Sequence, residues 1–285
     1  MGIKNSAPLT VGAAIDESGR IYRSSLPHLW LPAVVLAIIA AAANGAVSLV
    51  IPGLTIADAD WQRLLDIAAA LVSARMIALY VVTTLIALVV YGAFFSIQLS
   101  TAHGRASLSA PAALAASLLR LPRMTLAAVL NLVPIALTCA FIAIPGVYGA
   151  LLGLIWLLIP GTYVWGRLQL WMAVMFAEDA GVFASLAGSW RLMQGRWWRG
   201  TTILTLAFLV MTVFSSIVLA IGESAAALSQ LGPAGQQIIT QIFAASAYTL
   251  ASPMLSAACV AMYVQFKSRP QAGDLRERLE MPSSP

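Results

Sequence analysis

Charged residues are scarce in this sequence, and their scarcity decides its class. Asp, Glu, Lys and Arg make up 9% of the 285 residues, whereas 60% are apolar, and the mean hydropathy is +0.88. A chain of this composition cannot cover its apolar surface with polar side chains in water. A soluble fold is therefore excluded, and we expect lipid to be the solvent.

Cysteine and histidine are almost absent too. Cys139 and Cys259 both fall inside long apolar runs, where a thiol behaves as a small apolar group, so we expect no structural disulfide between them. His28 and His103 are the two histidines, and a metal site needs several converging His, Cys or carboxylate ligands. We therefore expect neither a metal nor another cofactor.

Recognisable catalytic groupings are missing as well. No ionisable residue lies near the centre of an apolar run, which excludes membrane proteolysis by paired aspartates and argues against an ion-coupled transporter. A serine mechanism lacks a histidine at membrane depth, and no glycine-rich phosphate loop is present. Glu178 and Asp179 are explained by pairing with Arg191 or Arg199 and by helix capping, with Asp179 as the N-cap. We expect a protein that is not an enzyme.

Long apolar runs are what the sequence does contain. A spanning helix needs about 20 largely apolar residues, and six runs reach that length, at 29–51, 76–100, 125–144, 147–175, 201–221 and 237–266. Pro134, Pro160 and Pro253 should kink or interrupt their runs. The runs predict an all-α polytopic membrane protein in which six transmembrane helices form three hairpins, and 1–285 form a single membrane domain.

The basic residues predict the orientation of these spans. With the N-terminus inside, all of the sixteen lysines and arginines except Arg63 and Arg75 fall on one side, and short loops rich in these residues stay cytoplasmic. We therefore expect a multi-pass protein of the bacterial cytoplasmic (inner) membrane with both termini in the cytoplasm. The net charge of +5 then faces anionic headgroups and not nucleic acid. Arg75 and Arg167 lie near span ends and should snorkel to the interface.

The N-terminal region has no apolar core typical of a secretory signal. Asp16 and Glu17 lie within its first 28 residues, so the first span is expected to be a retained anchor. Cleavage after the small residues Ala41 to Ala43 is the alternative.

A basic amphipathic segment precedes each pair of apolar runs, which divides the chain into repeat units at about 10–100, 109–176 and 179–266. Each segment carries an apolar stripe with a spacing of three or four residues, typical of an interfacial helix in the membrane plane. Gly195 is the predicted stop of the third helix. The stripes are Val11, Ile15, Ser18 and Tyr22 in the first unit, Leu114, Leu118 and Leu121 in the second, and Phe183, Leu186, Trp190, Met193 and Trp197 in the third.

Arginines and tryptophans of these segments are the candidate residues for binding a lipid headgroup or a partner. They are Arg191, Arg196, Arg199, Trp190, Trp197, Trp198, Arg120, Arg123, Arg20 and Arg23. Two interpretations stay open. The helices either only anchor the hairpins, or they form a cytoplasmic platform that binds anionic lipid or a membrane-protein partner.

Polar and small residues within the spans leave two further alternatives. Asn44, Asn131 and Gln241 either line an intramembrane cavity or form hydrogen bonds between helices. The small-residue rows Ala33, Ala37, Ala41 and Gly45, and Gly149 and Gly153, allow close packing either inside the protomer or in a homo-oligomer.

Two segments outside the spans complete the pattern. Residues 58–72 predict an amphipathic outer helix, which acts either as a surface helix or as a lid. Residues 270–285 mix charges with Pro, Gly and Ser and predict a disordered cytoplasmic tail.

Residues around the third segment resemble a known family. They are Glu178-Asp179-Ala180-Gly181, Ser189-Trp190-Arg191-Leu192, Gly195 and Trp197-Trp198-Arg199, with Pro253 and Tyr263 before Lys267 and Arg269. This pattern is similar to the glycerophosphoryl diester phosphodiesterase membrane domain, a family of six-span bacterial proteins. The resemblance implies a membrane location and a link to lipid biology. It implies no catalysis, since the soluble phosphodiesterase domain of some members is lacking here.

Two functions agree with these observations. The favoured one is a non-enzymatic membrane protein that organises or binds lipid, or assists a membrane complex, because the charge gathers at the rim and is missing from the interior. The alternative is a transporter or permease for a small or amphipathic solute, with a pathway near the intramembrane polar residues.

Overall fold

The computed structural model describes residues 10–50, 73–106, 108–142 and 147–280. Regular structure within these residues is helical, without strands. Six segments are long and apolar enough to cross a membrane: Val11–Ala43, Arg75–Ala102, Ala110–Phe141, Leu151–Glu178, Trp197–Leu228 and Gly235–Ser268. The prediction of an all-α polytopic membrane protein with six spans is therefore confirmed. The predicted outer helix at 58–72 lies outside the described residues.

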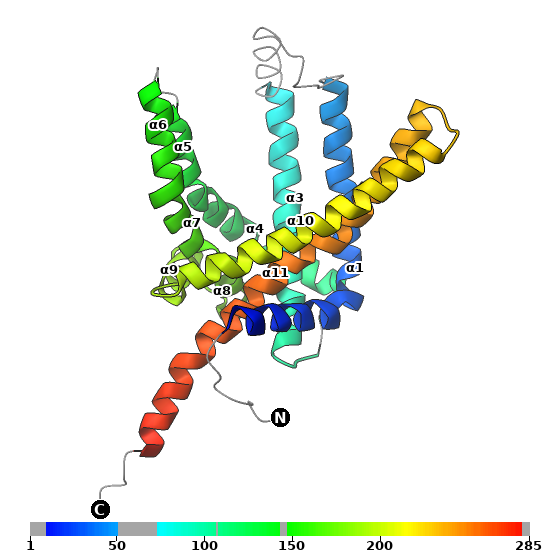
Figure 1. The fold of residues 1–285 in the computed structure, drawn as a ribbon. Helices are drawn as coiled ribbons and strands as arrows, with labels where there is room; N and C mark the ends of the chain where they lie inside the picture. Colours follow the sequence, from blue (N-terminus) through cyan, green and yellow to red (C-terminus); the bar gives the residue numbers. More distant parts are fainter. Residues whose placement is uncertain (1–9, 51–72, 107, 143–146, 281–285) are drawn as a thin grey trace, which may run out of the picture.

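The spans pair as three hairpins that diverge from a common end (Figure 1). The pairs are α1 (Val11–Val50) with α3 (Ala74–Ala102), α5 (Val133–Ile142) with α6 (Val147–Trp156), and α10 (Trp197–Leu228) with α11 (Pro233–Glu280). Helix α1 also packs along α11, so the first and third hairpins share a long interface. The described parts of α5 and α6 pack extensively only on each other and on the adjoining α4 and π-helical turn.

The common end of the hairpins is here named the base. It consists of α8 (Trp171–Glu178), α9 (Val182–Leu192), the first half of α1, α4 (Ala110–Asn131) and the last turns of the sixth span in α11 (Figure 1). The described chain begins and ends on this side of the molecule. An even number of spans requires this arrangement.

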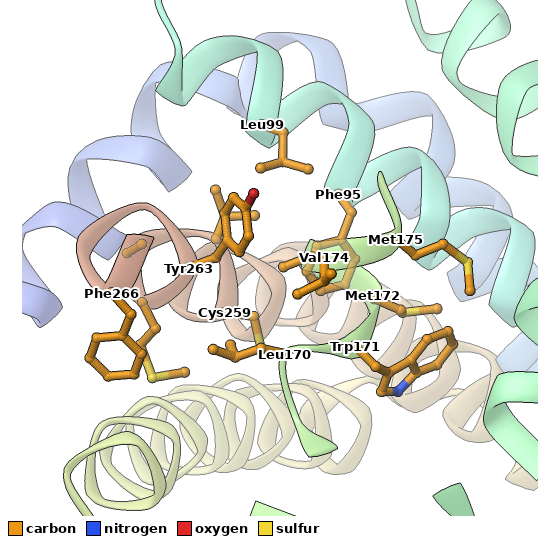
Figure 2. Packing of buried hydrophobic residues seen from close by; sticks show 14 of the residues in the cluster. Phe95, Leu99, Leu170, Trp171, Met172, Val174, Met175, Cys259, Tyr263 and Phe266 are labelled. Carbon is orange, nitrogen blue, oxygen red and sulfur yellow. The ribbon is translucent and has the colours of Figure 1, made fainter. Parts of the chain in front are cut away.

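Helix α8 forms the centre of the base. Every residue from Leu170 to Met175 is at most 8% exposed, which is the pattern of a helix that is apolar all round and enclosed by its neighbours. Figure 2 shows these side chains between α3, which contributes Phe95 and Leu99, and α11, which contributes Cys259, Tyr263 and Phe266. The base is therefore a packed core that joins segments far apart in the sequence.

The amphipathic segments flank this core, but only the third is a separate helix. The first two run directly into their spans as parts of α1 and α4. Each segment turns a face of small residues and serines toward the protein: Ala14, Ser18, Ile21 and Ser25 in α1, Ala113 and Ser117 in α4, and Ser185, Gly188 and Ser189 in α9. Small side chains let helices approach closely. The buried faces are therefore not the predicted apolar stripes as a whole, since Phe183 and Leu118 point outward, 73% and 60% exposed.

Two of the three predicted proline interruptions are present. Helix α4 ends one residue before α5 starts near Pro134, and Pro160 lies in a π-helical turn, η2 (Leu157–Gly161), that precedes α7 (Thr162–Leu168). Helix α11 continues through Pro253, so the helix is not interrupted there, and a kink at this proline stays a prediction. Carbonyl groups of α11 near this proline accept hydrogen bonds from neighbouring helices. Gln98 Nε2 donates to Pro253 C=O (2.8 Å), and Tyr22 Oη donates to Leu250 C=O (2.7 Å).

The predicted disordered tail is wrong for residues 270–280. Helix α11 extends to Glu280, and 281–285 lie outside the described residues. Asp274, Arg276, Arg278 and Glu280 place opposite charges four residues apart in a stretch of good helix formers, which favours helix over coil despite Pro270.

Several of the small residues in the predicted rows pack inside the protomer, which is the first of the two predicted uses of these rows. Gly149 and Gly153 are buried in the α5–α6 hairpin, and Ala33 and Ala37 are at most 3% exposed in α1. Helices α10 and α11 approach each other closely at Gly222, where an added Cβ would meet Phe243 Cβ at 2.5 Å.

Replacing Gly222 by Ala should therefore force α10 and α11 apart and cost about 1–3 kcal/mol, typical of overpacking. Gly19→Ala is the matched control, because nothing lies within 4 Å of a Cβ there and alanine favours the helix by roughly 0.5–1 kcal/mol. Thermal unfolding in detergent measures both variants. Equal stabilities would contradict the close contact at Gly222.

Candidate functional site at the base

The acidic pair after α8 is arranged differently from its prediction. Asp179 is the C-cap of α8 in a left-handed conformation (φ 49°), and Gly181 is the N-cap of α9. The predicted N-cap role of Asp179 is therefore wrong. The chain must reverse between two short helices, and Asp is one of the few residues that tolerate a left-handed backbone at such a turn.

Asp179 pairs with the second amphipathic segment and not with the third. Its Oδ1 accepts hydrogen bonds from Arg120 Nε (3.1 Å) and Nη2 (2.9 Å), and Arg123 Nη1 lies 4.0 Å away. The Arg120 guanidinium also lies 5.1 Å from the centre of the Phe176 ring. The predicted pairing with Arg191 or Arg199 is wrong, since α4 supplies the cations. These contacts are exposed and worth about 0–1 kcal/mol.

Glu178 connects α8 to α11. Its Oε1 accepts from Tyr263 Oη (2.9 Å) and from Lys267 Nζ (2.8 Å), and Lys267 Nζ also donates to Tyr263 Oη (2.8 Å). All three groups take part in one closed network, so this carboxylate is committed to holding the base together.

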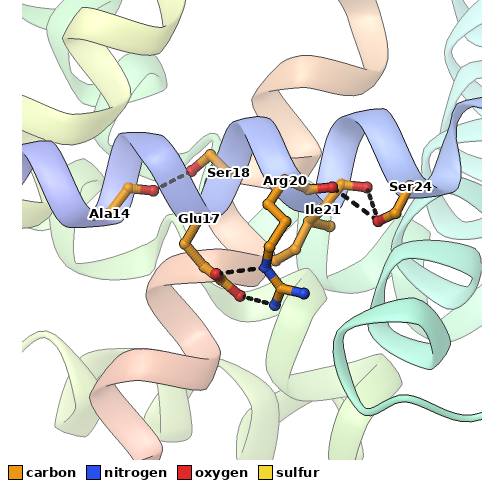
Figure 3. Close-up of polar contacts among 6 residues, drawn as sticks. All are labelled: Ala14, Glu17, Ser18, Arg20, Ile21 and Ser24. Atoms are coloured by element: carbon orange, nitrogen blue, oxygen red, sulfur yellow. Dashed lines mark hydrogen bonds and ion pairs between the residues drawn. The ribbon is translucent and has the colours of Figure 1, made fainter. Parts of the chain in front are cut away.

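The arginines of the first segment are separate from this network. Arg20 Nε donates to Glu17 Oε2 (2.8 Å) on the same helix, as Figure 3 shows. Arg23 is exposed and has no ion pair among the described residues. The first segment therefore contributes one paired and one unpaired arginine.

The arginines of the third segment form no ion pair among the described residues, although Arg191 interacts electrostatically with Glu178 at longer range. No carboxylate of a described residue lies within 4 Å of Arg191, Arg196 or Arg199. Arg196 Nη1 donates to Phe266 C=O (3.3 Å), and its guanidinium lies 5.6 Å from the Phe266 ring. The other two are exposed. Arg196 and Arg199 therefore carry positive charge without a paired carboxylate among the described residues where α9 passes into α10.

The predicted tryptophans lie together at this same place. Trp190 and Trp197 each make an edge contact with Tyr163 of α7, with ring centres 5.9 Å and 5.2 Å apart. Trp198 contacts Trp197 at 5.0 Å and is 69% exposed. Gly195, the predicted stop, has a φ of +70° and lies in the turn between the two helices. The cluster therefore extends from the interior to the surface.

Arg167 of α7 is a site residue that the sequence did not reveal. It is 7% exposed and packs against other helices, while its snorkelling to the interface stays a prediction. Its guanidinium lies 4.5 Å from the centre of the Trp190 ring and 5.0 Å from that of Tyr163. The spacing of Tyr163 and Arg167, one helical turn apart, is the signal that could have indicated the pair. The position of Trp190 over them depends on the tertiary fold.

Ser189 fixes this arrangement. Its hydroxyl donates to Arg167 C=O (2.8 Å) and accepts from Leu170 N–H (3.0 Å), where α7 ends and α8 begins. The neighbouring Trp190 is thereby held against the Arg167 side chain. Gly188 allows α9 this close, since an added Cβ would lie 2.8 Å from Val174 Cγ1.

Of the three intramembrane polar candidates, Asn131 and Gln241 are not brought together. Gln241 lines a cavity of about 320 Å³ between α1, α10 and α11, together with Ala37, Ala41, Ser215 and Tyr248. Asn131 does not line it, and its Oδ1 is enclosed without a hydrogen-bond partner. Asn44 lies in α1, but its side chain is outside the described part.

The described residues contain no group of three or more His, Cys, Asp or Glu placed to hold a metal ion. Both cysteines are free, Cys139 exposed and Cys259 buried.

Comparisons with models of protein families, with curated proteins and with solved structures found no match to this chain. The resemblance to the glycerophosphoryl diester phosphodiesterase membrane domain stays a prediction.

Replacing Ser189 by Ala should destabilise the protein by about 1–3 kcal/mol, because the buried Leu170 N–H and Arg167 C=O both lose their partner. Ser185→Ala is the control. Ser185 is equally buried, but its hydroxyl bonds only the carbonyl of Val182 in its own helix. Thermal unfolding should therefore show a larger loss for Ser189→Ala. Equal losses would mean that the bridge to α7 and α8 adds nothing.

Proposed function

We propose that this chain is a non-enzymatic protein of the bacterial inner membrane that binds and organises anionic lipid through its base, with both termini in the cytoplasm. The observation that carries the proposal is the set of arginines that form no ion pair among the described residues where α9 passes into α10, Arg191, Arg196 and Arg199, beside the exposed Trp198. Membership of the family named above is part of the same proposal.

Interfacial physics supports this assignment. An arginine near an anionic surface contributes about 1 kcal/mol to membrane binding, and tryptophan rings favour the headgroup level. Arginines that already pair with a carboxylate contribute less, because the negative charge cancels their field. Arg20, Arg120 and Arg123 form such pairs. Of the ten residues predicted to bind a lipid headgroup or a partner, those of the third segment and Arg23 therefore remain the candidates.

A second candidate function, transport of a small or amphipathic solute, is favoured by the cavity at Gln241. An amide, a hydroxyl and a phenol line this space among alanines, which is the composition of a site for a neutral amphipathic molecule. No Asp, Glu, His, Lys or Arg is among the described residues that line it, so this candidate does not include coupling to protons.

Changing Arg191, Arg196 and Arg199 together to Gln should reduce retention of phosphatidylglycerol at least tenfold, since about 3 kcal/mol of attraction is removed. Native mass spectrometry of the protein extracted in membrane patches measures the retained lipid.

The control for this variant is Arg269, Arg276 and Arg278 changed together to Gln, which removes the same charge on the side of the membrane predicted to be cytoplasmic. Its lipid retention should stay close to that of the wild type. An equal loss of retained lipid in both variants would mean that the effect depends only on net charge. Unchanged retention in the variant of Arg191, Arg196 and Arg199 would reject the proposal.

The variant Gln241→Cys, made in a chain in which Cys139 and Cys259 are replaced by Ala, tests the transport function. Transport predicts that a membrane-impermeant maleimide labels this thiol through a water-filled path. A cysteine replacing Ile242, which is 58% exposed on the lipid side of the same helix, should remain unlabelled. Absence of labelling at 241 would remove the support for transport.

A further inference from the structure

Arg167 combines burial with an unsatisfied charge. The side chain is 7% exposed, and arginine side chains in proteins are cationic. No carboxylate of the described residues lies within 4 Å of it. Three acids of the base are already paired, Asp179 with Arg120, Glu178 with Lys267 and Glu17 with Arg20.

The hydrogen-bond donors of this side chain are also unused. Nε is fully enclosed and has no acceptor, and no acceptor from the described residues meets the two Nη groups. Nη1 and Nη2 are not among the enclosed atoms, so the accessible tip of the side chain carries most of its N–H donors. A buried cation in this state is unfavourable unless an anion joins it.

Aromatic rings hold the guanidinium in place but do not neutralise it. Tyr163 and Trp190 stand at 86° to each other with the guanidinium 5.0 Å and 4.5 Å from their centres. Ring faces attract a cation, yet they accept no hydrogen bonds in its plane. The forked edge of the guanidinium therefore remains available, and this edge matches two oxygens of a phosphate group.

The site is continuous with the exposed surface of the base. The exposed Trp198 contacts Trp197, which contacts Tyr163, which lies against Arg167. Arg191 and Arg199 directly follow Trp190 and Trp198 in the sequence and form no ion pair among the described residues. An anion that approaches the row therefore meets a positive field.

We propose that Arg167, held between Tyr163 and Trp190, is a binding site for a phosphate oxyanion, and that the headgroup of an anionic phospholipid supplies it. This inference rests on the proposed function and names the ligand group and the residue that receives it. The peripheral arginines attract the lipid, and Arg167 binds its phosphate through two parallel N–H···O bonds.

The test measures thermal unfolding of delipidated protein in neutral detergent while palmitoyl-oleoyl-phosphatidylglycerol is titrated. A ligand that binds only the folded state raises the melting temperature with its concentration. The wild type should show this rise, and Arg167→Gln should need about ten to one hundred times more lipid, as expected from losing hydrogen bonds to a charged group. Without lipid, this variant should be as stable as the wild type or more stable, since an uncompensated charge has been removed.

Two further variants complete the design. Arg167→Lys keeps the charge and should also weaken the response, because an ammonium lacks the bidentate fork; it serves as the test if the Gln variant does not fold. Arg75→Gln, at an exposed position of another span, should respond as the wild type does. A parallel titration with inorganic phosphate identifies the source of the oxyanion. A rise that depends on Arg167 with phosphate alone would support the oxyanion site and assign it to free phosphate in place of lipid.

The outcomes separate this inference from the proposed function. A lipid response that survives in both Arg167 variants but is lost when Arg191, Arg196 and Arg199 are changed to Gln would overturn the Arg167 site and leave the proposed function intact. A wild type that responds to neither probe would overturn both. Equal destabilisation of the Arg167 variants with and without lipid would assign the residue a purely structural role and overturn the inference.

Discussion

The buried first turns of helix α8 are enclosed by helices from other parts of the chain. The positions of those helices depend on their packing against α8. Water does not drive association between helices in lipid, so close packing and hydrogen bonds must hold them together. Both are concentrated at the base, where Leu170 to Met175 are buried and Ser189 and Glu178 bond neighbouring helices. The hairpins are fixed at this end and diverge away from it (Figure 1).

This dependence makes the hairpins unequal in spite of their repeated sequence pattern. The first and third pack against each other through α1 and α11, where Gln98 and Tyr22 bond carbonyls around Pro253. The middle hairpin has its own glycines in its own interface and no comparable contact between its described residues and the other spans. The three units therefore share the order of their elements, but their packing at the base differs from unit to unit.

Charge at the base separates into two kinds. Acidic residues next to Arg20, Arg120 and Lys267 neutralise cations that stabilise the fold. Arg167, Arg191 and Arg199 form no ion pair among the described residues. Arg167 contacts a cluster of aromatic rings, and the other two directly follow tryptophans of that cluster in the sequence. Because an unpaired guanidinium is unfavourable near lipid unless an anion compensates it, the second kind marks the surface where function is to be sought.

The sequence by itself determined the class of protein, the number of spans and the place of the interruptions at Pro134 and Pro160. These depend on composition, length and local backbone chemistry, which require no knowledge of distant residues. It also identified the tryptophans and arginines of the third segment. Only the tertiary structure decided which arginines are paired, because partners such as Arg120 and Asp179 lie 59 residues apart.

The same reason explains the residues that the sequence placed wrongly or missed. Arg167 was missed as a site residue, since a span end gives no sign that Trp190 from another helix covers it. Ser185 and Ser189 read as polar positions outside the apolar stripe, yet α9 packs by this face because small residues allow the closest approach to α8. Periodicity determines which residues share a face of a helix. What that face contacts is decided only by how the other helices pack around α8.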